Sequence, residues 1–523
     1  MKENFSNYFK EFRSDLPSGL VVFLVALPLC LGIALASGAP LFSGIITGII
    51  GGIVVGLLSG SHLSVSGPAA GLTVIVLSAI TELGAFEIFL LAVVLAGVIQ
   101  IIMGYFKAGI IGLYFPSSVI KGMLAAIGLI LILKQLPHFL GVDQEAFGTT
   151  QYGDGHGHNT FTNFFFALQH IQAGAFIVGI LSLAILILWE RPLIKKQSWS
   201  KIVPGALVAV VVSVIINIVF SIFFPTLAIE ASHLVKLPIL NGGSPGTENI
   251  LTLPDFTAIA NPLVWKTALV IAIIASLETL LSVEAVDKLD PHKRRTPTNR
   301  ELKAQGVGNI IAGLLGGLPM TAVIVRSTAN LESGARTKMS AVYHGIFLLA
   351  AVLLIPNILN LIPLSALAAV LLMVGYKLAK PKLFMQQYKN GWEQFIPFVV
   401  TIIAILFTDL LIGITIGMVV GVFFILKANY KTPYFYHAED HPERDGHKQI
   451  TIVLSEHVSF INKASLQLTL EHLPANSLVT IDGSRSQDID FDALNIIKDF
   501  ASTADERNIQ LVVKNLPGNI NLN

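Results

Sequence analysis

A single carboxylate, Glu278, lies deep in the apolar run 268–282. Two hydroxyl residues, Thr279 and Ser282, follow it within about one helical turn, so the three side chains could face one cavity. A charged group inside a bilayer costs about 3 kcal/mol unless it meets a cavity or a partner, and such groups are usually functional. Glu278 could therefore carry a proton or bind a coupling cation. The alternative is a structural carboxyl that hydrogen-bonds a neighbouring helix.

An arginine, Arg326, lies in a second apolar stretch, about two helical turns after Pro319. A guanidinium this far into a span should face the protein interior and add positive potential for an anion. We favour this role over direct coordination of the anion. The alternative is a side chain that extends to the membrane interface.

Gly and Pro interrupt the apolar sequence in two short segments, 66–73 and 316–323. Each segment predicts an extended stretch followed by a half-helix that starts inside the bilayer, with the proline in its first turn. Such a helix start offers free backbone N–H groups and a positive dipole end, which suits an anion. Small residues that only allow close helix packing are the alternative. The predicted substrate-binding residues are Ala69, Ala70, Gly71, Thr73, Thr321, Ala322, Val323 and Arg326.

Other candidate groups point to ordinary roles. The tract 152–158 contains His156 and His158, but without partner ligands it reads as a solvated outer loop. Cys30 lies in an apolar run and reads as a packing residue. We find no nucleophile elbow, Walker loop or metalloprotease motif in the sequence, and therefore expect no enzyme, no metal, no cofactor and no nucleic-acid partner.

Composition predicts a membrane protein. Apolar residues make up 53% of the 523 residues and charged residues only 13%, about half the share in soluble proteins. Spans of about 20 apolar residues, shorter where a helix starts at mid-membrane, can be placed along most of the chain. The fourteen expected segments are 18–36, 41–58, 67–81, 86–106, 116–136, 173–190, 204–224, 264–284, 302–315, 320–332, 340–356, 363–377, 394–408 and 410–427.

Charge placement supports this count. Lys and Arg are concentrated in the connections 191–201, 285–303 and 378–389, while 137–172 has none and 225–263 has only one. Cytoplasmic termini put every basic connection inside, as the positive-inside bias requires. Because each set of seven spans is odd in number, the second set (about 260–430) should be inverted relative to the first (about 16–230).

The tail has a different pattern. Short apolar runs at 449–454, 477–481 and 509–513 read as buried strands, and 491–501 reads as an amphipathic helix. The predicted organisation is a cytoplasmic N-terminal segment (1–15), a transmembrane domain (16–430) and a small cytoplasmic α/β domain (448–523).

These motifs together resemble the SulP family of anion transporters, in the family's order and over nearly the whole chain. The resemblance rests on 15–28, 66–68, 276–282, 319–327 and 334–337. The tail resembles a STAS domain through Asp482-Gly483-Ser484 and the stretch 488–494 before a helix.

The resemblance implies an α-helical fold of fourteen transmembrane segments in a 7+7 inverted repeat. Spans 1–4 and 8–11 would form a core domain that moves in an elevator-like way against a gate domain of spans 5–7 and 12–14. It also implies a homodimer, a substrate held between the third and tenth helix starts, and coupling to protons or sodium at Glu278. Family substrates include sulfate, bicarbonate, chloride and dicarboxylates.

Two departures narrow the expectations. Sodium-coupled bicarbonate members of the family have a hydroxyl near the position of Ile324. The isoleucine side chain cannot ligate a cation, which counts against sodium coupling in this chain. Bacterial STAS regulators carry a phosphorylatable serine where Phe491 and Asp492 stand, so we expect no phosphoswitch there and rather a docking or dimer-stabilising role.

We therefore expect a secondary transporter of sulfate or bicarbonate in a bacterial inner membrane. A nucleobase permease shares the inverted fold and the acidic residue in span 8, but a neutral base needs neither Arg326 nor the tail. The same sequence features would also fit an anion channel, an exchanger, or a membrane-tethered signalling scaffold with a cytoplasmic partner.

Overall fold

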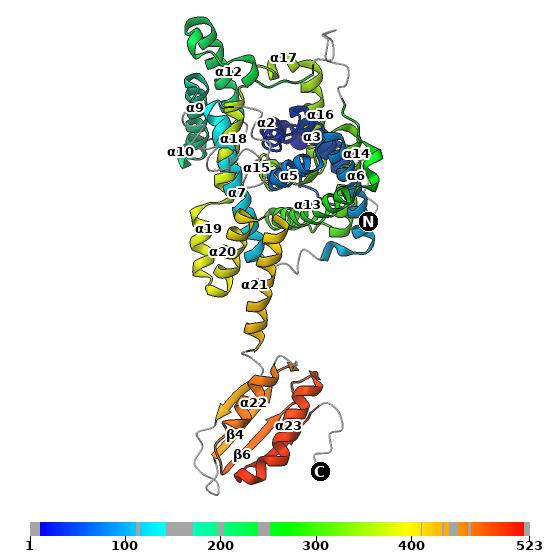
Figure 1. Cartoon of the computed structure of the whole chain (residues 1–523), viewed down its shortest axis with the longest axis vertical. Coiled ribbons are helices and arrows are strands. Elements are labelled where there is room, and N and C mark those ends of the chain that lie inside the picture. The colour runs from blue at the N-terminus through cyan, green and yellow to red at the C-terminus, as the bar shows by residue number, and fades with distance from the viewer. Residues whose placement is uncertain are drawn as a thin grey trace. The chain divides into compact units, whose positions relative to one another are not determined.

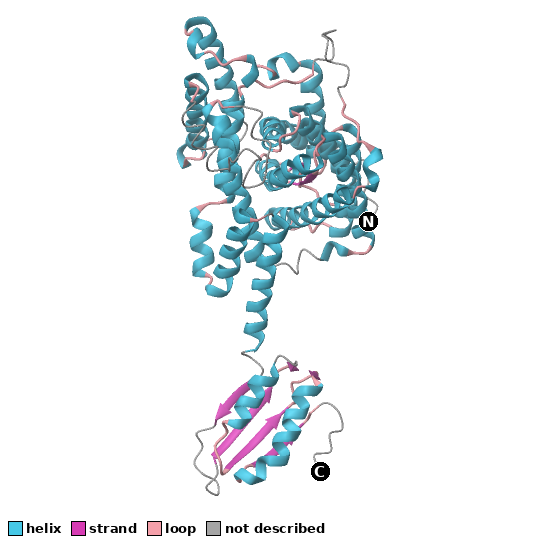
Figure 2. Cartoon of the chain, viewed as in Figure 1, coloured by secondary structure: helices cyan, strands magenta, loops and turns pink. Residues whose placement is uncertain are grey.

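The computed structural model has two compact units, Met1–Ile416 and Gly417–Asn523. The first is helical apart from two short strands, and the second contains a sheet flanked by helices (Figure 2). The residues described are 11–110, 116–142, 171–195, 197, 203–238, 251–408, 410–430, 434–438, 448–458 and 462–516.

The helices before residue 431 follow the order of segments expected from hydropathy, and the boundary between the two units falls within the last of them, α21. The first set of helices is α2 (Phe12–Ala36), α3 (Leu41–Ile50) continued by the π-helix η1 (Gly51–Val55) and α4 (Gly56–Leu58), α5 (Thr73–Leu83), α6 (Phe86–Tyr105), α7 (Ser117–Leu140), α9 (Ala173–Trp189) and α12 (Gly205–Phe223). The second set is α13 (Pro262–Leu289), α14 (Thr298–Leu315), α15 (Ile324–Glu332), α16 (Met339–Leu354), α18 (Leu364–Leu378), α20 (Trp392–Phe407) and α21 (Leu410–Tyr430). The short helices α10 (Pro192–Lys195), α17 (Pro356–Leu359) and α19 (Pro381–Lys389) lie in connections.

Each of the fourteen expected segments coincides with one of these helices. Within the described residues, seven helices have the length and composition to cross a membrane, and five shorter apolar helices accompany them. The chain is therefore an α-helical, multi-pass membrane protein. On α12, Val211, Ile215, Ile218 and Ile222 are 44–64% exposed at helical spacing, which is the pattern of a lipid-facing stripe.

The helices of the first unit form two groups (Figure 1). In one group α6 packs on α13 and α14, while α2 packs on α3 and α16. In the other, α7 packs on α18 and α20, and α9 packs on α12 and α18. The members of the two groups match the predicted core and gate spans.

Two strands, β1 (Ser66–Pro68) and β2 (Met320–Ala322), pair antiparallel inside the first group (Figure 2). In this ladder Ser66 is opposite Ala322 and Pro68 is opposite Met320. The expected extended stretches before α5 and α15 are thus confirmed. The expected position of the prolines was wrong, because Pro68 ends β1 and Pro319 precedes β2. Each helix begins only after the chain has left the ladder.

The second unit is an α/β domain, as expected. Its sheet has the order β3-β4-β6-β8, with β4 (Lys448–Leu454), β6 (Ser477–Asp482) and β8 (Gln510–Lys514) parallel. The sequence did not indicate β3 (Tyr434–Ala438), which pairs antiparallel with β4 and begins before residue 448. Two further short strands, β5 (His457–Val458) and β7 (Asp488–Ile489), pair in parallel.

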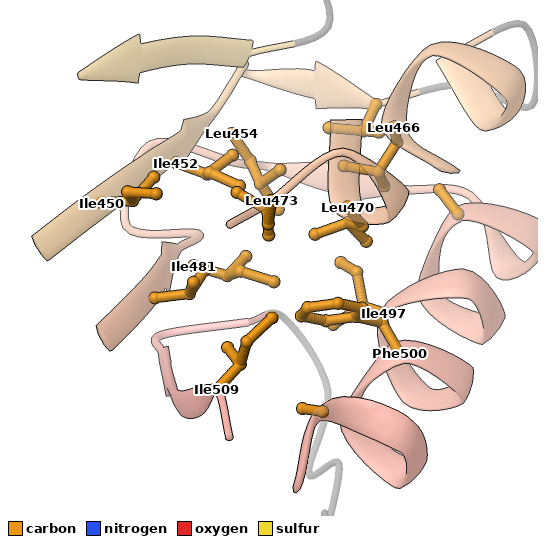
Figure 3. Close-up of a cluster of buried hydrophobic side chains, with 14 of the residues drawn as sticks. Ile450, Ile452, Leu454, Leu466, Leu470, Leu473, Ile481, Ile497, Phe500 and Ile509 are labelled. Atoms are coloured by element: carbon orange, nitrogen blue, oxygen red, sulfur yellow. The ribbon is translucent and has the colours of Figure 1, made fainter. Parts of the chain in front are cut away.

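One hydrophobic core holds this domain together (Figure 3). Ile450, Ile452 and Ile481 contribute from alternate strand positions, because side chains on one face of a strand recur every second residue. Helix α22 (Lys463–Glu471) adds Leu466 and Leu470. Helix α23 (Phe491–Thr503) presents Ala493, Ile497 and Phe500 at helical spacing.

Candidate functional site

The ladder of β1 and β2 brings two helix starts together. Because the strands are antiparallel, α5 and α15 leave from opposite ends of the ladder, each with its amino end next to it. The ladder is extended by one more bond, from the Val323 N–H to the Val65 carbonyl at 2.9 Å. The predicted meeting of two half-helices within one group of spans is therefore confirmed.

The first amides of each helix have no acceptor inside that helix. In α15 these belong to Ile324, Val325 and Arg326. On the α5 side a short 3-10 turn, η2 (Ala70–Leu72), comes first, so the corresponding amides begin at Ala70. Ile324 is 40% exposed, and Ala70 and Val323 are partly exposed. A ligand can therefore reach the two helix starts at these three residues.

The other predicted substrate-binding residues are buried next to these helix starts. Ala69 and Ala322 are buried, and the Ala322 N–H already donates to the Thr279 hydroxyl at 3.2 Å. Thr73 is buried and donates its hydroxyl to the Ala70 carbonyl at 2.8 Å. Thr321 is buried, and its hydroxyl has no hydrogen-bond partner among the described residues.

Glu278 lies directly against Gly71. A Cβ on Gly71 would lie 2.7 Å from Oε2 and 2.8 Å from Oε1 of Glu278, and the Gly71 N–H donates to this carboxyl. The other carboxyl oxygen, Oε2, is buried without a hydrogen-bond partner among the described residues. The small size of Gly71 therefore admits the carboxyl, which engages the Gly71 N–H.

The hydroxyl residues after Glu278 differ in what they contact. Thr279 is fully buried and ties α13 to β2 through the Ala322 amide. Ser282 is buried about one turn further along α13. The structure thus places one of the two hydroxyls on the ladder itself.

Arg326 lies in the first turn of α15, closer to the helix start than the expected two turns, because α15 begins only at Ile324. It is completely buried, its three side-chain nitrogens have no oxygen or nitrogen acceptor among the described residues, and the Cys30 side chain is a weak sulfur partner. A Cβ on Gly67 would lie 2.3 Å from Nη1, so the guanidinium packs on the backbone of β1. A buried cation without an anionic partner among the described residues projects its positive field into the ladder region. It does not extend to a membrane interface.

Several polar residues that the sequence analysis missed hold the two segments. The Thr47 hydroxyl accepts from the Leu318 N–H at 2.6 Å and donates to its carbonyl. The Ser327 hydroxyl accepts from the Val65 N–H at 2.9 Å. Asn330 donates to the Leu63 carbonyl at 3.0 Å. Their signal in the sequence is a polar side chain within an apolar span, which is costly unless it is satisfied. The tract 152–158 lies outside the described residues.

The fold and this site define a class of protein. Two broken helices that meet inside a bundle of membrane spans, with an intramembrane carboxylate beside them, are the construction of a secondary transporter. A sequence profile described as the sulfate permease family matches residues 12–404. The chain belongs to this family, and it is a membrane transporter rather than an enzyme.

Relatives and solved structures agree with this assignment. YvdB of Bacillus subtilis (strain 168) is 30% identical over 445 residues, which covers 84% of this chain and 79% of YvdB. The bicarbonate transporter BicA of Picosynechococcus is 27% identical, covering 79% of this chain and 70% of BicA. The sodium-independent sulfate anion transporter of Bos taurus is 25% identical, covering 80% and 70%.

Two solved structures share the fold. The transmembrane domain of a cyanobacterial BicA has a TM-score of 0.64 at 24% identity, covering 79% of this chain and 98% of that chain. Murine Slc26a9, an anion transporter solved in its inward-facing state, has a TM-score of 0.74 at 16% identity, covering 99% and 86%.

Proposed function

We propose that this protein is a secondary active transporter of an inorganic anion, sulfate or bicarbonate. The observation that carries the proposal is the antiparallel pairing of Ser66–Pro68 with Met320–Ala322, which joins two helix amino ends at one place. Relatives named as bicarbonate and sulfate transporters support the same substrate class.

The anion would bind at the accessible helix starts, near Ala70, Val323 and Ile324. The backbone N–H groups and helix dipoles there favour a negative charge. Arg326 would add positive potential from behind β1 without ligating the anion directly. A site made mainly of dipoles binds an anion weakly enough to release it on the other side of the membrane.

Glu278 would couple this binding to a proton or a cation. As a carboxylate it adds a negative charge next to Gly71, which opposes an anion at the same helix start. A proton or a sodium ion on the carboxyl removes that opposition, so the anion and the coupling ion would bind together. The unpartnered Oε2, with Thr279 and Ser282 nearby on α13, supports a group poised for such a ligand.

Movement would be of the elevator kind. The group containing α2, α3, α5, α6 and α13–α16 would carry the ladder as a core domain, against a gate domain containing α7, α9, α12, α18 and α20, to which we also assign α21. We further propose a homodimer in a bacterial inner membrane, with both termini cytoplasmic and the α/β domain available to a cytoplasmic partner.

Uptake of radiolabelled sulfate and bicarbonate into proteoliposomes, with and without a sodium gradient and a proton gradient, tests the proposal. Saturable uptake of one anion, accelerated by one gradient, is the expected result. Counterflow of labelled anion against unlabelled anion distinguishes a carrier from a channel. Uptake of a neutral nucleobase in place of either anion would contradict the proposal.

A further inference from the structure

Among the described residues, the outer edge of β2 has no neighbouring strand, yet its three residues are buried. In an antiparallel ladder, alternate residue pairs bond each other and the remaining residues turn their N–H and C=O groups outward. Val323 bonds Val65 across the ladder, so Met320 and Ala322, which are offset by odd steps from Val323, turn outward. Buried outward groups of this kind need partners.

Two side chains from neighbouring helices supply those partners. The Thr279 hydroxyl on α13 accepts from the Ala322 N–H. On α14, the Asn309 Oδ1 accepts from the Met320 N–H at 2.7 Å, and its Nδ2 donates to the Met320 carbonyl at 3.4 Å. The carboxamide thus bonds both backbone groups of one residue, as an adjacent strand would.

The Asn309 carboxamide is itself held in one orientation. Its Nδ2 also donates to Gln100 Oε1 on α6 at 2.7 Å, and Gln100 Nε2 donates to the Ser276 hydroxyl on α13 at 3.2 Å. All three side chains are at most 1% exposed. Because each amide has a single donor end, reversing one would bring two donors or two acceptors together.

Close packing of α6 on α14 makes this chain of hydrogen bonds possible. A Cβ on Gly97 would lie 2.5 Å from the Gly306 carbonyl oxygen, and one on Gly306 would lie 2.6 Å from the Gly97 carbonyl oxygen. With both positions glycine, the two backbones approach closely enough for Gln100 to reach Asn309. This series of hydrogen bonds ends at Ser276, which lies two positions before Glu278 on α13.

We propose that Asn309 is a positioning residue for transport: it replaces the missing strand beside β2 and, through Gln100 and Ser276, fixes β2 relative to the helix that carries Glu278. This role rests on the proposed anion transport. It requires that Asn309 set the geometry of the α15 start, and therefore the apparent affinity for the anion, without touching the anion.

Asn309→Asp is the sharpest test, because it keeps size and the Oδ1 acceptor but replaces the donor. A second oxygen would then face both the Met320 carbonyl and Gln100 Oε1. The chain offers a matched control in Asn360, whose Oδ1 accepts from the Leu237 N–H at 2.7 Å and whose Nδ2 donates to the Leu237 carbonyl at 3.1 Å. Asn360 thus bonds both backbone groups of one residue, as Asn309 does, but that residue belongs to neither strand of the ladder.

The measurement is KM and maximal rate for labelled sulfate and bicarbonate in proteoliposomes of the full chain. For Asn309→Asp we expect KM to rise about tenfold, as for a lost buried hydrogen bond. For Asn360→Asp we expect a change in KM within about twofold. Ser276→Ala removes the hydroxyl at the end of the hydrogen-bond series. It should raise KM by about threefold while the protein elutes as wild type on size exclusion.

Unchanged KM in both Asn309→Asp and Ser276→Ala would overturn the proposed role, as would an equal rise of KM in Asn360→Asp. If Asn309→Asp does not fold, Ser276→Ala alone decides. Absence of uptake of either anion by the wild-type protein would instead overturn the proposed function on which this role rests.

Discussion

The Glu278 carboxyl occupies the space that any side chain at position 71 would need. A Cβ on Gly71 would lie 2.7 Å from Oε2, closer than Cβ atoms come to other heavy atoms. The carboxyl from α13 and the amide before α5 therefore meet only because residue 71 is glycine. This contact joins the proposed coupling group to the proposed anion site.

Replacing Gly71 with alanine should push the Glu278 carboxyl away from the Gly71 amide. We expect ion-coupled accumulation to fall about tenfold or more, since misplacement of a functional group by 1 Å can cost about a hundredfold. Gly56→Ala is the matched control, because a Cβ there would make only ordinary contacts at 3.4 Å or more. Accumulation by both variants at the wild-type level would contradict the importance of this contact.

Replacing Glu278 with glutamine should separate exchange from accumulation. The amide keeps the shape but neither exchanges a proton nor carries a charge, so uphill uptake should disappear while exchange of labelled for unlabelled anion continues. Glu284→Gln on the same helix is the control, because Glu284 is exposed and pairs with Lys288. Gradient-driven accumulation that survives in Glu278→Gln would exclude Glu278 as the coupling group.

Replacing Arg326 with alanine should weaken anion binding. The loss of an unpaired buried positive charge near the α15 start should raise the apparent KM about tenfold, equivalent to about 1.4 kcal/mol. The effect should resemble a loss of field, with a larger factor for doubly charged sulfate than for singly charged bicarbonate, because a Coulomb energy scales with the charge of the anion. Arg336→Ala, which removes a largely exposed side chain paired with Glu11, should leave KM unchanged. An unaltered KM in Arg326→Ala would count against the field argument.

Replacing Asp15 with alanine should destabilise the first unit. Asp15 is completely buried in the first turn of α2 and accepts from the N–H groups of Arg336 and Thr337 at 2.8 and 3.1 Å, just before α16. Removing this acceptor leaves buried donors without a partner, which should cost about 1–3 kcal/mol. Thermal unfolding in detergent measures the effect.

Glu11→Ala is the comparison for that measurement. Its ion pair with Arg336 is partly exposed at 3.0 Å, so its loss should cost less than about 1 kcal/mol. Equal midpoints for Asp15→Ala and the wild-type protein would show that the contact between α2 and the residues before α16 contributes little.

The sequence by itself determined the spans, the two interruptions and the α/β tail. These features depend on hydropathy, on Gly and Pro, and on strand and helix periodicity, which act within a few neighbouring residues. It also singled out Glu278 and Arg326, because a charge in an apolar run is conspicuous. β3 (Tyr434–Ala438) was not predicted, because the polar residues 439–447 separate it from the other strands and its pairing with β4 is a tertiary contact.

Only the tertiary structure decided which groups meet. The pairing of Ser66 with Ala322 and the fit of Glu278 against Gly71 join residues far apart in the sequence. The bond between Asn309 and Gln100 spans 209 positions. Such contacts leave no local pattern, because a buried amide or hydroxyl is satisfied by whichever backbone or side chain the packing of the helices brings to it.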